Sequence, residues 1–345
     1  MSSRMTALAR FPLSRHLRQV GAVLPGLALT LAIALGALFL HERLGVGALS
    51  PLLLSIVTGI VIGNLVPLPG VLLPGIAFSM KRLLRLGVIL LGLQLTLAQV
   101  AELGVSGIAI VVVTLVATFV VTRRVGAWLG VSRPLSELIA AGTAVCGASA
   151  VLATDLVSRA RDEEVAYAIA CVTIFGTLSM LLYPLLAVPL DLGQVAYGLW
   201  SGATIHEVAQ VVAAAFQVGD EAGHTGTIAK LARVVLLAPL VFSLAFMRRG
   251  DGAGGAAGRP PLPWFVLGFL AMVGLNSAVA LPQGLLEDAR LATTLLLSLA
   301  LAAMGLETRL SRLRAEGLRP LALGGFAWLF VSGLGLALVL ALTTP

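Results

Sequence analysis

Apolar runs of about 20 residues follow one another along almost the whole of this sequence, and each is long enough to cross a bilayer as a helix. Only short connectors separate them, so no soluble domain fits between. Hydrophobic residues make up 59% of the chain and charged residues 11%, and the mean hydropathy is +1.03. A soluble domain carries more than twice that share of charge. The sequence therefore predicts an all-α polytopic membrane protein.

Two of the apolar segments differ from the rest, because Gly and small polar residues crowd their centres. We expect these two, 135–155 and 195–217, to be re-entrant hairpins or broken helices, which gives nine to eleven membrane segments. A Gly- and Ala-rich run at 252–258 is typical of a flexible connector. The segments lie at about 23–40, 50–66, 83–100, 103–122, 135–155, 164–189, 195–217, 225–247, 263–281, 290–306 and 319–342.

The formal net charge of +7 does not indicate nucleic-acid binding, because the basic residues lie in short clusters between apolar runs. If the segments 135–155 and 195–217 are re-entrant hairpins, every Lys and Arg faces the cytoplasm except Arg43, Arg290, Lys230 and Arg233. This favours a bacterial inner membrane protein with a cytoplasmic N-terminus and a periplasmic or extracellular C-terminus. The basic residues near the start precede a run that we interpret as a retained first helix.

An internal repeat is visible at an offset of 213 residues, where GLQLTLAQVAELG (92–104) aligns with GLETRLSRLRAEG (305–317) and Pro69 with Pro282. It predicts repeat units at about 52–122 and 265–335 within one transporter domain, 1–345, whose halves are about 23–190 and 191–345. An odd number of crossings separates the copies. They should therefore run in opposite directions, which is the inverted repeat typical of secondary transporters.

The small-residue centres predict a binding site, because backbone that leaves the helix at membrane depth exposes N–H and C=O groups. Half-helix N-termini and nearby hydroxyl groups suit an oxyanion. The alternative is close helix packing through small residues. The predicted substrate-binding residues here are Thr143, Cys146, Gly147, Ser149, Ser201, Gly202 and Thr204.

Lys230 and Arg233 lie one turn apart in an otherwise apolar segment and complete the predicted anion site. A charge inside the bilayer costs about 3 kcal/mol or more and indicates a functional residue. The alternatives are a structural ion pair with Glu207 or Asp155, or snorkelling to the membrane surface. The two cysteines, Cys146 and Cys171, lie in apolar segments and indicate neither a disulfide nor a zinc site.

His206, Glu207 and Gln210 follow the second small-residue centre in the run SGATIHEVAQ, and we predict that they couple transport to an ion. A carboxylate beside a histidine can exchange protons near neutral pH. A capping network is the alternative role, and Na⁺ coordination by Glu207 and Asp155 stays open. Gln210 stands where a zinc protease needs its second histidine, so no metal or other cofactor is predicted.

Three motifs, CGASAVLATDLV, YGLWSGATIHEVAQVVAAAF and AKLARVVLLAPLV, together with GLQL, resemble the YeiH-type family of sulfate exporters, which are bacterial inner-membrane proteins. The resemblance covers nearly the whole chain. It implies a secondary transporter with an inverted repeat, and sulfate or a related anion as substrate.

The sequence therefore predicts a secondary active transporter, an exporter of a small inorganic or organic anion such as sulfate, which works by ion-coupled alternating access. An anion channel is the nearest alternative. A hydrolase using Ser149 and His206 is a more distant one, and no Walker loop indicates ATP as energy source. The expected partners are the anion, the lipid bilayer and a coupling H⁺ or Na⁺, and a homo-oligomer stays open.

Overall fold

The computed structural model of the chain describes residues 13–44, 50–249, 264–308 and 317–343, and these ranges contain helices and no strand. Six of the described helices are long and apolar enough to cross a membrane. The apolar stretches that could span it begin at Gly21, Gly104, Asp162, Asp220, Gln283 and Leu318. The predicted connector at 252–258 lies outside the described residues.

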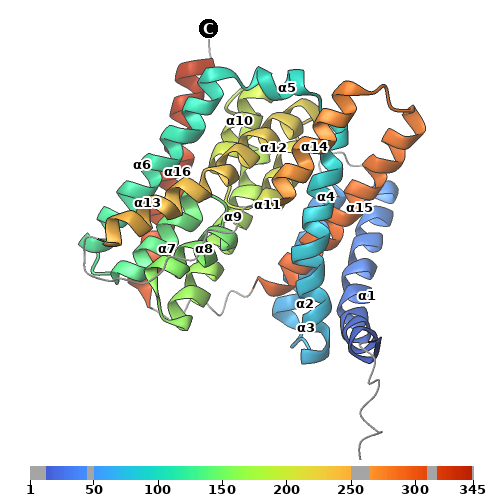
Figure 1. The fold of residues 1–345 in the computed structure, drawn as a ribbon, viewed down its shortest axis with the longest axis horizontal. Coiled ribbons are helices and arrows are strands. Elements are labelled where there is room, and N and C mark those ends of the chain that lie inside the picture. Colours follow the sequence, from blue (N-terminus) through green and yellow to red (C-terminus); the bar gives the residue numbers. More distant parts are fainter. Residues whose placement is uncertain (1–12, 45–49, 250–263, 309–316, 344–345) are drawn as a thin grey trace, which may run out of the picture.

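The helices form two groups that lie side by side in Figure 1. The group on the right contains α1 (Leu13–Leu44), α2 (Pro51–Leu65), α3 (Leu73–Phe78), α4 (Leu84–Leu91), α14 (Trp264–Ala278) and α15 (Gln283–Glu307). The group on the left contains α6 (Gly104–Trp128), α7 (Arg133–Ala144), α8 (Ala148–Ser158), α9 (Asp162–Ala187), α10 (Gln194–Thr204), α11 (Val208–Phe216), α12 (Asp220–Val235), α13 (Leu237–Arg249) and α16 (Leu318–Thr343). The short α5 (Leu97–Glu102) joins them at the top of the view.

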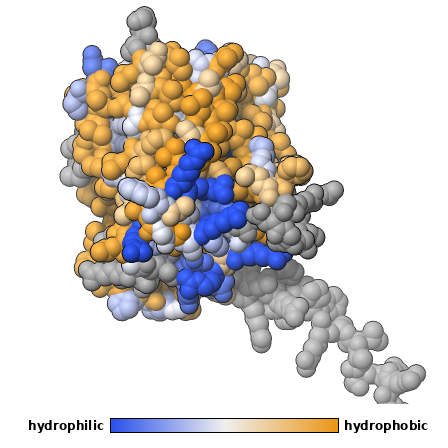
Figure 2. Space-filling model, turned by 90° about the vertical axis from the view of Figure 1, so that its left-hand side faces the viewer, coloured by the Kyte–Doolittle hydropathy of each residue, from blue (hydrophilic) through white to orange (hydrophobic). Residues whose placement is uncertain are grey.

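The outer surface of the left-hand group is apolar over most of its height, and hydrophilic side chains gather toward its lower part (Figure 2). Large apolar residues are exposed along α6, including Val105, Ile108 and Val116. Exposed apolar surface on this scale suits a hydrocarbon environment, because a soluble monomer exposes only small apolar patches.

Glycines allow the backbones of the right-hand group to approach closely. A Cβ added to Gly92 of the 3₁₀ turn after α4 would lie 2.5 Å from the carbonyl oxygen of Phe269 on α14. A Cβ added to Gly305 of α15 would lie 2.4 Å from the carbonyl oxygen of Ile56 on α2. Both residues of the second contact lie 213 positions from those of the first. The predicted repeat thus relates two equivalent contacts.

Two asparagines make a similar pair of hydrogen bonds. Asn64 at the end of α2 donates to the carbonyl oxygen of Thr308 at 2.7 Å, and Asn276 near the end of α14 donates to that of Leu95 at 3.1 Å. The accepting residues are again 213 positions apart, and the donors 212. In each case a polar side chain satisfies a carbonyl group left free where the neighbouring helical segment ends.

The helix directions follow from which residues meet. Gly59 contacts Ala302 and Gly63 contacts Leu306, so α2 and α15 run parallel. Helix α14 runs parallel to α4, since Ile89 meets Gly268 and Gly92 meets the stretch 269–272. Helix α2 therefore pairs with α15, and α4 pairs with α14, each in the parallel direction.

The third predicted segment differs from the structure. We expected it to begin at residue 83, after a cytoplasmic basic cluster, but the helix begins ten residues earlier, at Leu73, and passes through a π turn (η2, Ser79–Leu83) into α4. Lys81, Arg82 and Arg85 therefore lie inside this helix and not before it. A hydropathy window lowers its score over a basic cluster and so misplaces the helix start.

We predict that Gly305→Ala destabilises the protein, because the added methyl group would overlap the backbone of α2. Overpacking of this kind costs about 1–3 kcal/mol, so the midpoint of thermal unfolding in detergent should fall. Gly274→Ala on α14 is the matched control, since no heavy atom lies within 4 Å of its added Cβ. Equal midpoints for the two variants would contradict the close approach of α2 and α15.

Candidate functional site: the meeting point of two broken helices

The first broken segment folds back on itself. Ser132 caps the start of α7 with its hydroxyl group, and Gly147 reverses the chain with φ +66°, a conformation that favours glycine. At the far end of α8, Ser158 donates a hydrogen bond of 2.7 Å to Glu137 near the start of α7. Both ends of the α7–α8 hairpin therefore lie together.

The second broken segment, α10–α11, also folds back so that its two ends lie together. The hydroxyl group of Tyr197, near the start of α10, donates to the carbonyl oxygen of Ala214, near the end of α11, at 3.2 Å. Gln194 at the start of α10 accepts a hydrogen bond from the backbone N–H of Ala222, beyond the end of α11. The reversal uses extended backbone at Ile205 and Glu207.

Helix α9 connects the two hairpins, so their tips approach from its opposite ends. The tip of the α10–α11 hairpin contacts the middle of α9, where Gln210 donates to the carbonyl oxygen of Thr173 and the hydroxyl group of Thr177, both at 3.2 Å. Gly176 leaves room there, since an added Cβ would lie 2.1 Å from Gln210. The 26-residue helix α9 thus fixes the meeting point at its mid-length.

Two fully buried cations of α12 join the tips. The ammonium group of Lys230 donates to the carbonyl oxygens of Val145 at 2.6 Å and Ile205 at 2.7 Å. Arg233 donates to the carbonyl oxygens of Ala144 at 2.9 Å, Thr143 at 2.6 Å and Ile205 at 3.3 Å. These oxygens are the free C-terminal carbonyl groups of α7 and α10, where a positive charge is favoured.

Neither cation forms an ion pair within the described residues. The structure thus gives Lys230 and Arg233 carbonyl partners in place of the Glu207 or Asp155 partner considered in the sequence analysis. Lys has three N–H donors and Arg has five, so one donor of Lys230 and two of Arg233 remain beyond the hydrogen bonds described above.

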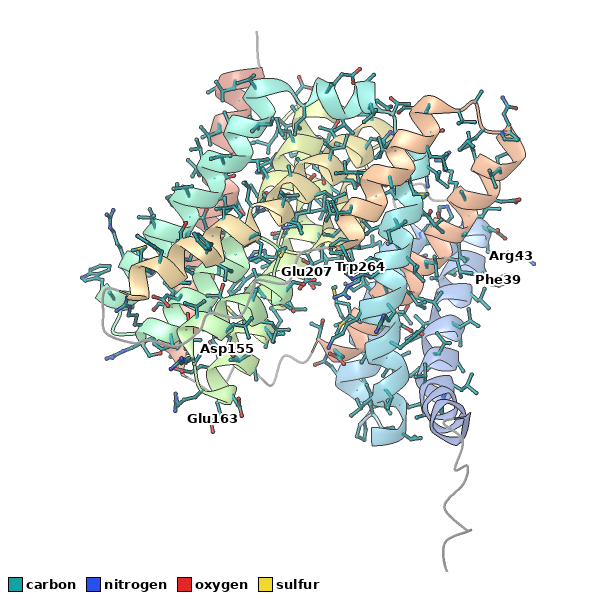
Figure 3. All side chains as sticks on the ribbon, viewed as in Figure 1. Phe39, Arg43, Asp155, Glu163, Glu207 and Trp264 are labelled. Carbon is teal, nitrogen blue, oxygen red and sulfur yellow. The ribbon has the colours of Figure 1, made fainter. Side chains whose placement is uncertain are left out.

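Glu207 connects the tips a second time. Its carboxylate accepts a hydrogen bond of 3.1 Å from the backbone N–H of Ala148, the first residue of α8. It also lies against Gly147, where an added Cβ would be 2.5 Å from Oε1. This helix N-terminus is where the sequence analysis expected the oxyanion, and the Glu207 carboxylate lies there instead. Figure 3 shows Glu207 on the side of its group that faces α4 and α14.

The other predicted residues of the α7–α8 hairpin lie within the same few residues of chain. Thr143 contributes its carbonyl oxygen to Arg233, and its side chain is buried. Cys146 is a buried free thiol. Ser149 is exposed on the first turn of α8, one residue after the N–H group that binds Glu207.

On the α10–α11 hairpin the predicted residues face other helices. Gly202 packs against the backbone of Gly226 on α12, with 2.3 Å from an added Cβ to its carbonyl oxygen. Ser201 donates to the carbonyl oxygen of Gly198 within its own helix. Thr204 lies 3.0 Å from the hydroxyl oxygen of Tyr183. The packing alternative therefore describes the contacts of Gly202 in this structure.

His206 lies in the reversal between α10 and α11 and is 1% exposed. Its Nδ1 atom has no hydrogen-bond partner among the described residues. Gln210 accepts from the backbone N–H of Glu207 at 3.1 Å, which orders the first turn of α11. Within the described part of the chain no hydrogen bond joins His206 to Ser149.

The sequence analysis missed a polar network beside Thr204. The hydroxyl group of Tyr183 on α9 donates to Ser332 on α16 at 2.7 Å, and the ring of Tyr183 stacks on Trp200 with 3.9 Å between centroids. Trp200 donates to the carbonyl oxygen of Ser332 at 2.9 Å. A lone Tyr or Ser in a Leu-rich segment gives no local signal, because its partner lies far away in the sequence.

A family model described as "Conserved hypothetical protein 698" matches residues 25–324. The UPF0324 membrane protein PA5383 of Pseudomonas aeruginosa is 41% identical over 339 residues, which cover 93% of this chain and 95% of that protein. The UPF0324 inner membrane protein YeiH of Salmonella typhi is 39% identical, with 94% and 97% covered. No solved structure matches the chain.

The chain therefore belongs to the UPF0324 family of membrane proteins, which confirms its resemblance to YeiH-type proteins. With six apolar helices of spanning length, it is a multi-pass inner-membrane protein.

We predict that Arg233→Met strongly destabilises the protein, because the buried carbonyl groups of Thr143 and Ala144 would lose their donor and that of Ile205 would keep only Lys230. A buried polar group without a partner costs about 1–3 kcal/mol, so the fall in the unfolding midpoint should exceed that of Gly305→Ala. Arg124→Gln, at an exposed position on α6, is the control and should leave the midpoint unchanged. A stable Arg233→Met protein would show that the tips are held by other contacts.

Proposed function

We propose that this protein is a secondary active transporter that exports a small anion by alternating access. The observation that carries the proposal is the meeting of two broken hairpins at the mid-length of α9, with Lys230 and Arg233 bridging both tips. Irregular backbone at this depth is tolerated in membranes only where protein or a water-filled cavity surrounds it. Transporters bind their substrates at such places.

The charge at the tips favours an anion. Lys230 and Arg233 together carry two positive charges, and Glu207 supplies one negative charge when ionised. The remaining donors of the two cations and the exposed Ser149 hydroxyl group would provide hydrogen bonds to a bound oxyanion. Thr143, Cys146, Gly147, Ser201, Gly202 and Thr204 would shape and support that site.

The two repeat units would supply the symmetry that alternating access needs. The contacts Gly92 with Phe269 and Gly305 with Ile56 share the 213-residue offset and support this repeat. We interpret 52–122 and 265–335 as an inverted repeat, in which the two hairpins re-enter the membrane from opposite faces. The N-terminus would then be cytoplasmic and the C-terminus periplasmic.

Glu207 is our proposed coupling group, with His206 and Gln210 as supporting residues. A proton on Glu207 would make its carboxyl group neutral and raise the net positive charge of the tips, so protonation and anion binding would favour one another. The bridge from Glu207 to the N–H group of Ala148 crosses between the hairpins. Its strength would therefore depend on the protonation state of Glu207.

We expect saturable uptake of radiolabelled sulfate, sulfite or a small organic anion into proteoliposomes under an imposed pH gradient. Glu207→Gln should remove the dependence on the gradient while the protein stays folded, since the amide oxygen can still accept from Ala148. Lys230→Gln should abolish uptake, because it removes one of the two buried positive charges.

Arg124→Gln is the control for surface charge and should transport normally. Unfolding midpoints for each variant separate loss of transport from loss of structure. Flux that persists in folded Lys230→Gln and Arg233→Gln proteins would mean that both cations are purely structural, and the proposed site would be wrong. Flux that never saturates would favour the anion channel.

A further inference from the structure

An ion pair joins the two groups of helices. Arg290 on α15 donates from Nη2 to both carboxylate oxygens of Asp220, the first residue of α12, at 3.1 Å each. Both side chains are 62% exposed. Helix α15 belongs to the right-hand group and α12 to the left-hand group, so the pair crosses the boundary between them (Figure 1).

A cavity of about 270 Å³ lies beside this pair. Asp220 and His224 line it from α12, whereas Leu93, Asn276 and Arg290 line it from the right-hand group. Leu93 is only 8% exposed, so the inner part of this lining is shielded from the surroundings. The ion pair therefore forms part of the wall of a cavity that both groups line.

The pair lies on one side of the hairpin tips. Helix α12 begins at Asp220 and reaches Lys230, which bridges the tips, ten residues later. At 1.5 Å per residue this is a distance of about 15 Å along the helix. In the orientation proposed above, α12 begins at the outer face of the membrane. The pair therefore lies on the outer side of the tips.

The pair is weak and the repeat is built without it. Ion pairs between exposed side chains contribute little to the stability of a fold. The residue equivalent to Arg290 in the first repeat unit, 213 positions earlier, is Ala77, so the equivalent helix forms without a cation at this position. A weak contact across the boundary between two groups is suited to form and break during transport.

We propose that Asp220 and Arg290 form an outer latch, which holds the two groups together when the outer side is closed and opens when the anion is released there. The proposal rests on the transport function and adds the contact that controls its outer side. Because exposed ion pairs are weak, the latch shifts the equilibrium between closed and open states by about two- to fivefold.

The first test measures how fast a cysteine in the cavity reacts with a membrane-impermeant thiol reagent outside right-side-out membrane vesicles. Leu93→Cys lines the cavity, and Leu95→Cys is the matched control, because Leu95 is fully buried and outside this lining. Both native thiols are buried, so wild-type protein gives the background. Arg290→Gln and Asp220→Asn should each speed the reaction of Leu93→Cys about two- to fivefold and leave Leu95→Cys unchanged.

Removing a charge also changes the local potential, so the rates are measured with one anionic and one cationic methanethiosulfonate. An opened latch speeds both reagents, whereas a change in potential speeds one and slows the other. Asp220→Asn combined with Arg290→Gln should react no faster than either single variant, since both remove the same contact. Unchanged rates, opposite changes for the two reagents, or additive effects would overturn the proposal.

The second test holds the latch closed. Asp220→Cys with Arg290→Cys is joined by a short bis-methanethiosulfonate before reconstitution, and uptake of radiolabelled sulfate is measured before and after reduction with dithiothreitol. We expect joining to lower uptake to the background and reduction to restore it. Val279→Cys with Leu285→Cys is the matched control. Both positions are about half-exposed but lie in the right-hand group, so joining them should leave uptake unchanged.

The two tests separate the latch from the transport function. Joined protein that transports at the wild-type rate would overturn the latch and leave the transport function standing. A wild-type protein without saturable uptake would refute the transport function. Faster reaction of Leu93→Cys in the Arg290→Gln variant would then still support the latch as the closure of this cavity.

Discussion

The bridge from Lys230 and Arg233 to four backbone carbonyl groups is the interaction on which the centre of this protein depends. Each broken helix ends at mid-depth with free carbonyl groups that water cannot reach. Two buried cations satisfy both ends at once, and the same carbonyl groups stabilise the buried charges. Removing either partner leaves the other unsatisfied, so hairpins and cations stabilise one another.

The two groups of helices differ in the residues that hold them together. The left-hand group carries the hairpins, the cations and Glu207, whereas the right-hand group is held by glycine contacts such as Gly305 with Ile56.

The helices and the two broken segments could be predicted from the sequence. Hydropathy locates the helices, and clusters of small residues around Gly147 and Gly202 indicate the broken segments. The 213-residue offset that relates Gly92 to Gly305 also relates the residues that these two glycines contact, Phe269 and Ile56. The partners of Lys230 could not be predicted, since backbone carbonyl groups carry no sequence signal. The predicted start of the third segment at residue 83 was wrong, because the charge of Lys81 and its neighbours lowers the hydropathy of the helix that begins at Leu73.

The most direct test of the account is counterflow in proteoliposomes. A transporter that alternates between two sides returns faster when it is loaded, so unlabelled sulfate inside the vesicles should accelerate uptake of labelled sulfate. Glu207→Gln should retain this exchange, since exchange needs no net movement of the coupling ion. Uptake that is indifferent to internal anion, and that rises linearly with external concentration, would contradict alternating access and indicate a channel.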